Sequence, residues 1–262
     1  MHRWIKIITP IIFMLVHIQA GCTTELFTQK FDAVLHDHVS EGIIQGITLN
    51  MVDYQSIQKD PRYQALIEDL HTIHVDNLTG PEKMAFWINT YNVCAIKMVL
   101  DHYPVTSIKD IGGFFQTVWD TPVIIIRTDE YTLGEIEHSI LRPMGDPRIH
   151  CAIVCASLSC PNLRKEAYTP ENLDEQLDDQ VRKFLNNETK GAAFKDSALR
   201  VSAIFKWFDE DFEAYNGVRG FLKKYLSSEK QEQLSETTTI RYLPYDWSLN
   251  NSARVEKKND ID

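Results

Sequence analysis

Residues 148–163 read RIHCAIVCASLSCPNL, and this stretch holds three of the chain's five cysteines, Cys151, Cys155 and Cys160. Its first half is continuously apolar, which predicts a buried strand over residues 148–155. Successive side chains of a strand point to opposite faces, so Cys151 and Cys155 would share one face and His150 would lie on the other. Cys155 would end the strand, where a side chain can be both rigidly held and reachable. The chemistry of the chain is therefore expected in this stretch.

Residues 79–102 predict a long helix, with Thr79 as a candidate cap and an end before Pro104. Apolar side chains cover most of its circumference, which is typical of a buried central helix. Asn89 and Asn92 lie about one turn apart on it, and a buried amide without a partner costs about 1–3 kcal/mol. Each amide is therefore expected either to clamp a loop by hydrogen bonds or to orient a catalytic group or an oxyanion.

The other segments indicate a mixture of helices and strands. Helices are predicted over residues 23–40, twice within 53–72, and over 133–141, 169–185 and 220–226, and strands over 118–127, 200–207 and 240–247. We therefore expect one α+β domain over residues 22–252, in which the central helix packs on a mainly antiparallel sheet and other helices flank it. The polar residues 253–262 are predicted to form a disordered tail.

The N-terminus has the three regions of a secretory signal. Two basic residues precede an apolar run, and the small residues Ala20 and Gly21 precede Cys22. We expect a signal peptide over residues 1–21, of the lipoprotein type in which Cys22 is lipidated, and ordinary cleavage after Ala20 is the alternative. The protein would then be exported, to the periplasm or as an outer-membrane lipoprotein, where disulfides are permitted.

The composition excludes some classes of partner. The chain has 27 Lys+Arg against 37 Asp+Glu, and no basic run suggests nucleic acid. Neither a Walker motif nor a Rossmann fingerprint is present, so the chain is not an obvious nucleotide enzyme. No cofactor is expected. The expected partner is an unidentified substrate or envelope protein, and contact with a membrane would run through the lipid on Cys22.

Two titratable residues follow a capping box at residues 132–135. On a helical wheel Glu137 falls within the buried stripe of this short helix, and His138 lies at its edge. A carboxylate that faces a core is costly unless it is paired, and burial raises its pKa. The two residues are therefore candidates for an acid and a base, or for a structural ion pair with Arg142 or Arg148.

Three interpretations remain open for Cys155 and Cys160. They can form a disulfide, supply a thiol nucleophile assisted by His138 or His150, or bind a metal with these histidines. The metal interpretation lacks the usual paired spacings of zinc sites. Cys151 is expected to be an ordinary buried residue, as is Cys94 on the central helix.

Six ordered blocks resemble the family known as domain of unknown function 547. They are AFWINTYN at 85–92, LGEIEHSILR at 133–142, DPRIHCAIVCASLSCPNL at 146–163, AYTPENLDEQL at 167–177, IFKWFDEDF at 204–212 and YLPYDWSLN at 242–250. The resemblance spans roughly residues 54–250 and implies the exported or lipid-anchored bacterial branch. It implies no established reaction, but its bacterial pattern includes seven residues of interest here: Asn89, Asn92, Glu137, His138, His150, Cys155 and Cys160. The fold is expected to be loosely like that of papain and transglutaminase.

The leading hypothesis is a cell-envelope thiol enzyme, a hydrolase or acyltransferase that acts on amide, peptide or ester bonds. Cys155 would be the nucleophile, Cys160 the alternate or resolving thiol, His138 the base and Glu137 its orienter. Asn89 or Asn92 would hold the loop or the oxyanion. The alternative is a non-enzymatic binding or scaffolding lipoprotein whose polar cluster is structural. A third class, a thiol–disulfide oxidoreductase, departs from the usual CxxC spacing.

Overall fold

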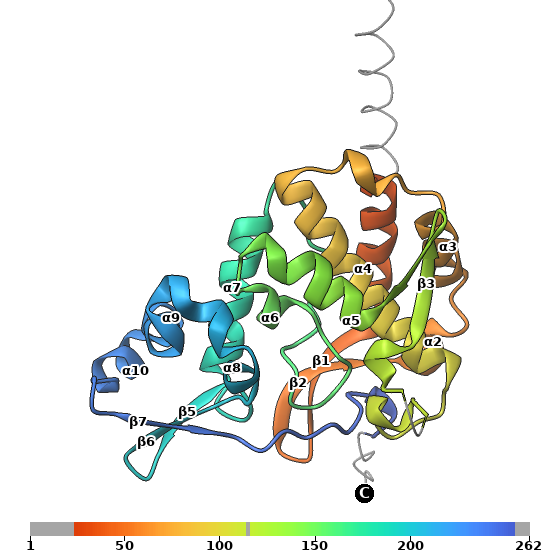
Figure 1. Ribbon diagram of the computed structural model, residues 1–262. Helices are drawn as coiled ribbons and strands as arrows, with labels where there is room; N and C mark the ends of the chain where they lie inside the picture. The colour runs from red at the N-terminus through yellow and green to blue at the C-terminus, as the bar shows by residue number, and fades with distance from the viewer. Residues whose placement is uncertain (1–23, 114–115, 255–262) are drawn as a thin grey trace, which may run out of the picture.

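The computed structural model describes residues 24–113 and 116–254 of the chain. It consists of a larger lobe of helices and short strands and a smaller lobe at the C-terminal side (Figure 1). The predicted signal peptide and Cys22 lie outside the described residues, as do residues 255–262 of the predicted tail. Within the described part of the chain, no helix is long and apolar enough to cross a membrane.

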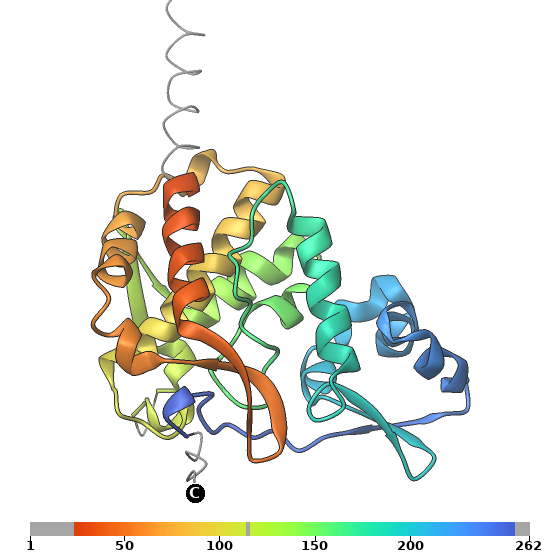
Figure 2. The same cartoon turned by 180° about the vertical axis from the view of Figure 1, so that it is seen from behind.

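Helix α4 (Gly80–Asp101) runs through the middle of the larger lobe, as its sequence predicts. Every residue from 84 to 96 is buried, because neighbouring elements cover the helix on all sides. The helix formed by residues 24–38 lies in front of it in the view of Figure 2. The larger lobe also contains α2 (Tyr54–Ile57), α3 (Pro61–Leu70), α5 (Leu133–Glu135), α6 (Ile149–Ala152) and the short helices η1 (Val75–Asn77), η2 (Ile108–Asp110), η3 (Val118–Asp120), η5 (Arg142–Met144) and η7 (Ser252–Arg254).

The strands of residues 24–113 and 116–254 form three small sheets. Hairpin β1 (Val39–Ile44) and β2 (Ile47–Val52) is antiparallel, as is hairpin β3 (Pro122–Ile126) and β4 (Asp129–Thr132). In the smaller lobe, β6 (Ala198–Val201) pairs antiparallel with β5 (Ala192–Lys195) and parallel with β7 (Thr239–Tyr242). The α+β class and the buried central helix are confirmed, while the likeness to papain and transglutaminase is not.

The predicted strand over residues 148–155 is wrong. Residues 149–152 form the helical turn α6, and an extended segment follows it. A short apolar run does not distinguish a buried strand from a buried helical turn, because both lack a polar face. The strand over 200–207, predicted from alternating apolar residues, is wrong in its second half, since β6 ends at Val201 and α8 (Ile204–Trp207) follows.

Helix α7 (Leu173–Asn186) joins the cores of the two lobes. Leu173 and Leu177 pack in the larger core, whereas Val181, Phe184 and Leu185 pack in the smaller one. The smaller lobe is completed by η6 (Asp209–Tyr215), α9 (Gly217–Tyr225) and α10 (Ser228–Gln233). Because one helix belongs to both cores, the two lobes are packed as one unit.

The chain after β7 crosses back from the smaller lobe to the larger one (Figure 1). Isolated bridges attach it to the larger lobe, where Ser248 pairs with Ser107, Leu249 with Ser157 and Asn251 with Val52. This return segment therefore carries its aromatic side chains over the junction between the lobes.

Asn89 and Asn92 clamp the irregular chain that follows α6. Asn92 donates from Nδ2 to the Ala152 carbonyl at 3.0 Å and accepts from the Val154 N–H at 2.8 Å. Asn89 makes the same pair of bonds to the backbone of Tyr168, at 2.7 and 2.9 Å. These buried backbone groups have no strand partner, so the two amides replace a sheet ladder.

Replacing Asn92 with Ala should lower the free energy of unfolding by about 2–4 kcal/mol, because it leaves a buried carbonyl and a buried N–H unpaired. Urea denaturation measures this change. The control is Asn77→Ala in η1, a partly exposed position that should change stability by about 0.5 kcal/mol or less. Equal losses in the two variants would contradict the clamp.

Candidate active site

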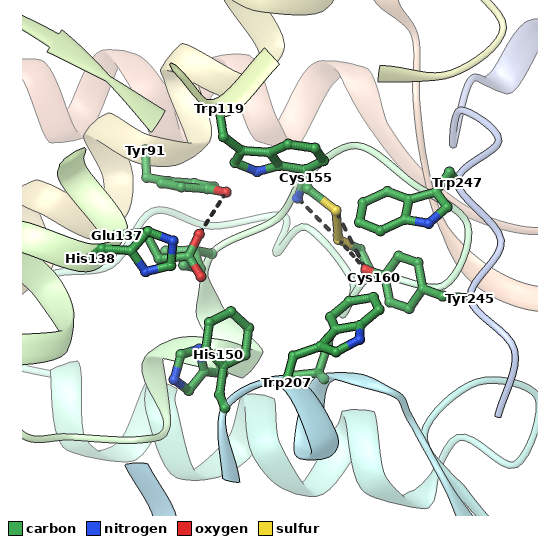
Figure 3. Close-up of a pocket in the computed structure, with 13 residues that line it drawn as sticks. Tyr91, Trp119, Glu137, His138, His150, Cys155, Cys160, Trp207, Tyr245 and Trp247 are labelled. Atoms are coloured by element: carbon green, nitrogen blue, oxygen red, sulfur yellow. Dashed lines mark hydrogen bonds between the residues drawn. A yellow bond between two sulfur atoms is a disulfide. The ribbon is translucent and has the colours of Figure 1, made fainter. Parts of the chain in front are cut away.

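A cavity of about 320 Å³ opens at the junction of the two lobes. Its walls come from α4, η3, the segment after α6, α8 and the return segment, together with the π-helical turn η4 (Ile136–Leu141). Figure 3 shows the side chains around it. They are mostly aromatic or aliphatic, with a few polar groups among them: Tyr91, Trp119, Glu137, His138, His150, Ile153, Cys155, Cys160, Ile204, Trp207, Phe208, Tyr245 and Trp247.

Cys155 and Cys160 form a disulfide on one wall of this cavity. Cys155 is 9% exposed and Cys160 is 3% exposed, so Cys155 is the more exposed of the two residues. The Cys155 N–H donates to Cys160 Sγ at 3.0 Å, and the Tyr245 hydroxyl donates to the same sulfur at 3.1 Å. Both donors would stabilise a thiolate on Cys160, because a hydrogen bond to a charged acceptor is stronger than one to a neutral acceptor.

The backbone between the two cysteines is held in an uncommon conformation. Ala156 has φ of +60°, in the left-handed region that few non-glycine residues adopt. Its carbonyl accepts from the Asn250 N–H at 3.0 Å, and Leu158 donates to the Ser248 carbonyl at 2.8 Å. The return segment thus fixes this turn, and such strained residues are frequent at functional sites.

Glu137 lies on the opposite side of the cavity from the disulfide, beside Tyr91 (Figure 3). Its side chain comes from the π-helical turn, and the residue is 6% exposed. Burial raises the pKa of Glu137 to about 7, although the Tyr91 hydroxyl, 3.4 Å away, favours the charged form. A carboxyl group with this pKa can both donate and accept a proton near neutral pH.

His138 is exposed at the edge of the cavity, as the helical wheel predicts. Its Nδ1 accepts from the Arg142 guanidinium at 3.4 Å. Partial burial and this guanidinium lower the pKa of His138, so the imidazole is neutral at pH 7. Among the hydrogen bonds of the described residues, none joins His138 to either sulfur.

His150 belongs to a buried polar cluster next to the cavity. Its Nε2–H donates to Asp211 at 2.6 Å, and Arg142 donates to the same carboxylate at 2.7 Å. Phe208 stacks on the imidazole with the ring centroids 4.0 Å apart. Burial lowers the pKa of His150 to about 4, so this residue is a weak base. Its hydrogen bond to Asp211 of η6 links the two lobes.

Sequence reasoning missed the aromatic wall of the cavity. Trp247 packs edge-on against Trp119 with centroids 5.4 Å apart, and it stacks on Trp207 at 5.7 Å. Tyr245 lies 4.5 Å from Trp247 and 4.8 Å from Trp207, again between ring centroids. The YLPYDW block contained the signal, but two aromatic residues near the end of a chain are ordinarily core residues.

The structure brings five of the seven predicted site residues to one cavity. Asn89 and Asn92 do not line it, and they act through the backbone that carries the cysteines. The predicted contact between Cys155 and a histidine is absent, since the Cys155 sulfur contacts the hydroxyls of Ser157 and Tyr245 instead.

The two other cysteines of the described chain are buried and free, as predicted. Burial raises the pKa of the Cys94 thiol to about 12, and it also raises that of Cys151. These two thiols are therefore unreactive in the folded protein. No cluster of three or more His, Cys, Asp or Glu side chains suited to a metal occurs among residues 24–113 and 116–254.

Comparison with known proteins gives a partial match to one family model and no function. Residues 75–185 match the model of the family described as "Protein of unknown function, DUF547", which supports the resemblance seen in the sequence. The match covers α4, the Glu137 turn and both cysteines of the disulfide. No curated protein and no solved structure matches the chain.

Glu137→Gln should make the stability of the protein less dependent on pH. The folded protein binds the Glu137 proton with a pKa of about 7, above the ordinary value of 4.5, so the free energy of unfolding falls as pH rises between these values. The loss approaches about 3 kcal/mol above pH 7. Gln keeps the shape without the charge, so the variant should unfold later than the wild type at pH 8 and similarly at pH 4.5.

Denaturation with urea at a series of pH values measures this difference. Glu135→Gln, two residues away and exposed, should leave the pH dependence of the wild type in place. A wild-type protein whose stability does not decline between pH 4.5 and 7 relative to Glu137→Gln would contradict a buried, protonated Glu137.

Proposed function

We propose that the chain is a cell-envelope thiol enzyme and that the Cys155–Cys160 pair catalyses thiol–disulfide exchange. One observation carries the proposal: the disulfide lines an apolar cavity, and its Cys160 sulfur accepts from two donors, the Cys155 N–H and the Tyr245 hydroxyl. A structural disulfide has no need of a cavity or of thiolate-stabilising donors. A thiol–disulfide oxidoreductase is therefore favoured over a hydrolase or acyltransferase and over a scaffolding protein, although the spacing of its cysteines departs from CxxC.

The first step is attack of a substrate thiolate on Cys155, the more exposed of the two residues. A bond forms between the substrate sulfur and Cys155 Sγ, and the Cys155–Cys160 bond breaks. Its electron pair passes to Cys160, which leaves as a thiolate between the Cys155 N–H and the Tyr245 hydroxyl. Stabilisation of the leaving thiolate accelerates such an exchange.

In the second step, another thiolate of the substrate attacks the substrate sulfur of the mixed disulfide. Cys155 leaves, so the substrate dithiol becomes a disulfide and the protein pair gains two electrons and two protons. The reverse steps with a disulfide substrate restore the oxidised pair. Glu137, with a pKa of about 7, can supply one of these protons to a thiolate in the cavity, where water is scarce.

The envelope location rests on the predicted signal peptide. A disulfide that survives in its oxidised state fits an exported protein, since the cytosol keeps most thiols reduced. Lipidation at Cys22 would hold the cavity close to a membrane surface and would add no group to it.

A cysteine-dependent hydrolase or acyltransferase is the second candidate. The observation in its favour is that Glu137 faces the same cavity as the sulfurs, so a reduced Cys155 could attack an acyl carbon while Glu137 protonates the leaving group (Figure 3). Against it, the base expected at the sulfur is missing, because His138 and His150 contact Arg142 and Asp211 instead.

The single cysteine variants should separate these functions. Cys160→Ser leaves Cys155 facing the cavity without its resolving partner. Its thiolate should attack the disulfide of an oxidised peptide, expel one peptide thiolate and stay joined to the other sulfur as a stable mixed disulfide. Cys155→Ser leaves only Cys160, the less exposed of the two residues, and should form the adduct about tenfold more slowly or worse. Mass spectrometry of the intact protein measures both adducts.

The hydrolase predicts a different result. Cys160→Ser would then cleave ester or amide substrates at the wild-type rate of the reduced protein, without accumulating a mixed disulfide with the peptide. A binding or scaffolding role predicts a pair that exchanges with no thiol while the protein is folded, and this result would overturn the proposal.

Tyr245→Phe should make the pair more reducing, because it removes a donor that favours the Cys160 thiolate. A hydrogen bond to a charged group is worth about 1.5–3 kcal/mol, which corresponds to a reduction potential lower by roughly 30–60 mV. Equilibration with glutathione buffers measures the potential. Tyr242→Phe is the matched control, since Tyr242 is exposed and should leave the potential unchanged. A potential that is equal or higher in Tyr245→Phe would contradict the assigned role of the phenol.

A further inference from the structure

A second cavity, of about 450 Å³, lies behind the cysteine turn. Its walls are the β1–β2 hairpin, the segment of residues 162–166 and helix α7. The chain as a whole is acidic, with a formal charge of −10. The charged residues around this cavity have the opposite balance, since four cations and two carboxylates line it: Arg164, Lys165, Lys183, Lys190, Glu41 and Glu166.

Lys190 is the unusual member of this set. It is 4% exposed, and its Nζ donates to the Cys160 carbonyl at 2.6 Å and to Asn162 Oδ1 at 2.7 Å. Both acceptors are neutral. None of the ion pairs among the described residues includes Lys190, whereas Lys183 pairs with Asp179 at 2.9 Å. An ammonium group has three N–H donors, so one of them is left over.

Arg164 adds a second unused donor. It is 9% exposed, and its terminal nitrogens pair with Glu166 and with Asp179. Its Nε–H is buried and has no acceptor. A buried donor without an acceptor costs free energy, so an oxygen-bearing ligand that reached either donor would be stabilised.

We propose that this second cavity binds a small oxyanion, a carboxylate or phosphate group, with the Lys190 ammonium as its main partner and Arg164 as a second donor. The ligand must be an acceptor, because the two unused groups are both cationic donors. Burial also lowers the pKa of Lys190 to about 7, and a bound anion would favour its charged form. The site is independent of the exchange reaction, although Lys190 touches the Cys160 carbonyl.

Direct titration of the whole protein tests this site. Sodium phosphate and sodium acetate are added in turn, with sodium chloride holding the ionic strength constant, and binding is followed by calorimetry and by amide chemical shifts. We expect saturable binding at millimolar concentrations or tighter. The shifts should concentrate on Lys190, Asn162 and Asn50, a cavity residue whose N–H donates to Asn162 Oδ1 at 3.1 Å.

Variants then assign the binding to Lys190. Lys190→Met should lose at least tenfold in affinity, and Lys190→Arg, which keeps the charge, should retain most of it. Lys223→Met, on the exposed face of α9, is the control and should bind as the wild type does. If Lys190→Met does not fold, the chemical shifts of the wild type alone decide whether the oxyanion binds at Lys190.

The outcomes distinguish the two sources of the oxyanion. Binding of acetate alone supports a carboxylate ligand, and binding of phosphate alone supports a phosphoryl ligand. Shifts spread over the surface, or no saturation by either ion, would overturn the proposal. Exchange activity in the cysteine assays is measured separately, so failure here leaves the proposed function unaffected.

Discussion

The site depends on the hydrogen bonds that two asparagines of helix α4 make to the backbone of an irregular segment, residues 152–168. Residues 152–168 are largely buried, yet they form no sheet, so their polar groups need other partners. Asn92 supplies them at Ala152 and Val154, directly before the cysteine turn, and Asn89 does so at Tyr168. The rigid, buried helix thereby holds the cysteine turn in place. A side chain on such a turn can face a cavity and still be well positioned.

The chemistry of the cavity follows from its low polarity. The same apolar walls that exclude water keep Glu137 protonated up to about neutral pH and strengthen the hydrogen bonds at the Cys160 sulfur. These walls come from both lobes and from the return segment, which contributes Tyr245 and Trp247. The site therefore exists only when the lobes are docked, and α7 and the His150–Asp211 pair hold them together.

Part of the fold and part of the site were predictable from local sequence patterns. Residue spacing within a single helix was enough to predict each of three features: the capping box at Thr132, the burial of α4 and the burial of Glu137. The structure confirms all three. The strand at 148–155 failed because a short apolar run shows burial without showing conformation. The contacts of the two histidines and the role of Tyr245 join segments far apart in sequence, and no local spacing encodes such contacts.

The most direct test is thiol mapping by mass spectrometry on the folded, purified protein, before and after mild reduction. We predict a Cys155–Cys160 disulfide that is reduced without unfolding, after which the freed pair labels in the folded protein below the ordinary thiol pKa of about 8.5, because the Cys155 N–H and the Tyr245 hydroxyl stabilise the Cys160 thiolate. Cys94 and Cys151 should label only in denaturant, because both are buried. A pair that stays oxidised until the protein unfolds would contradict the account and assign the disulfide a structural role.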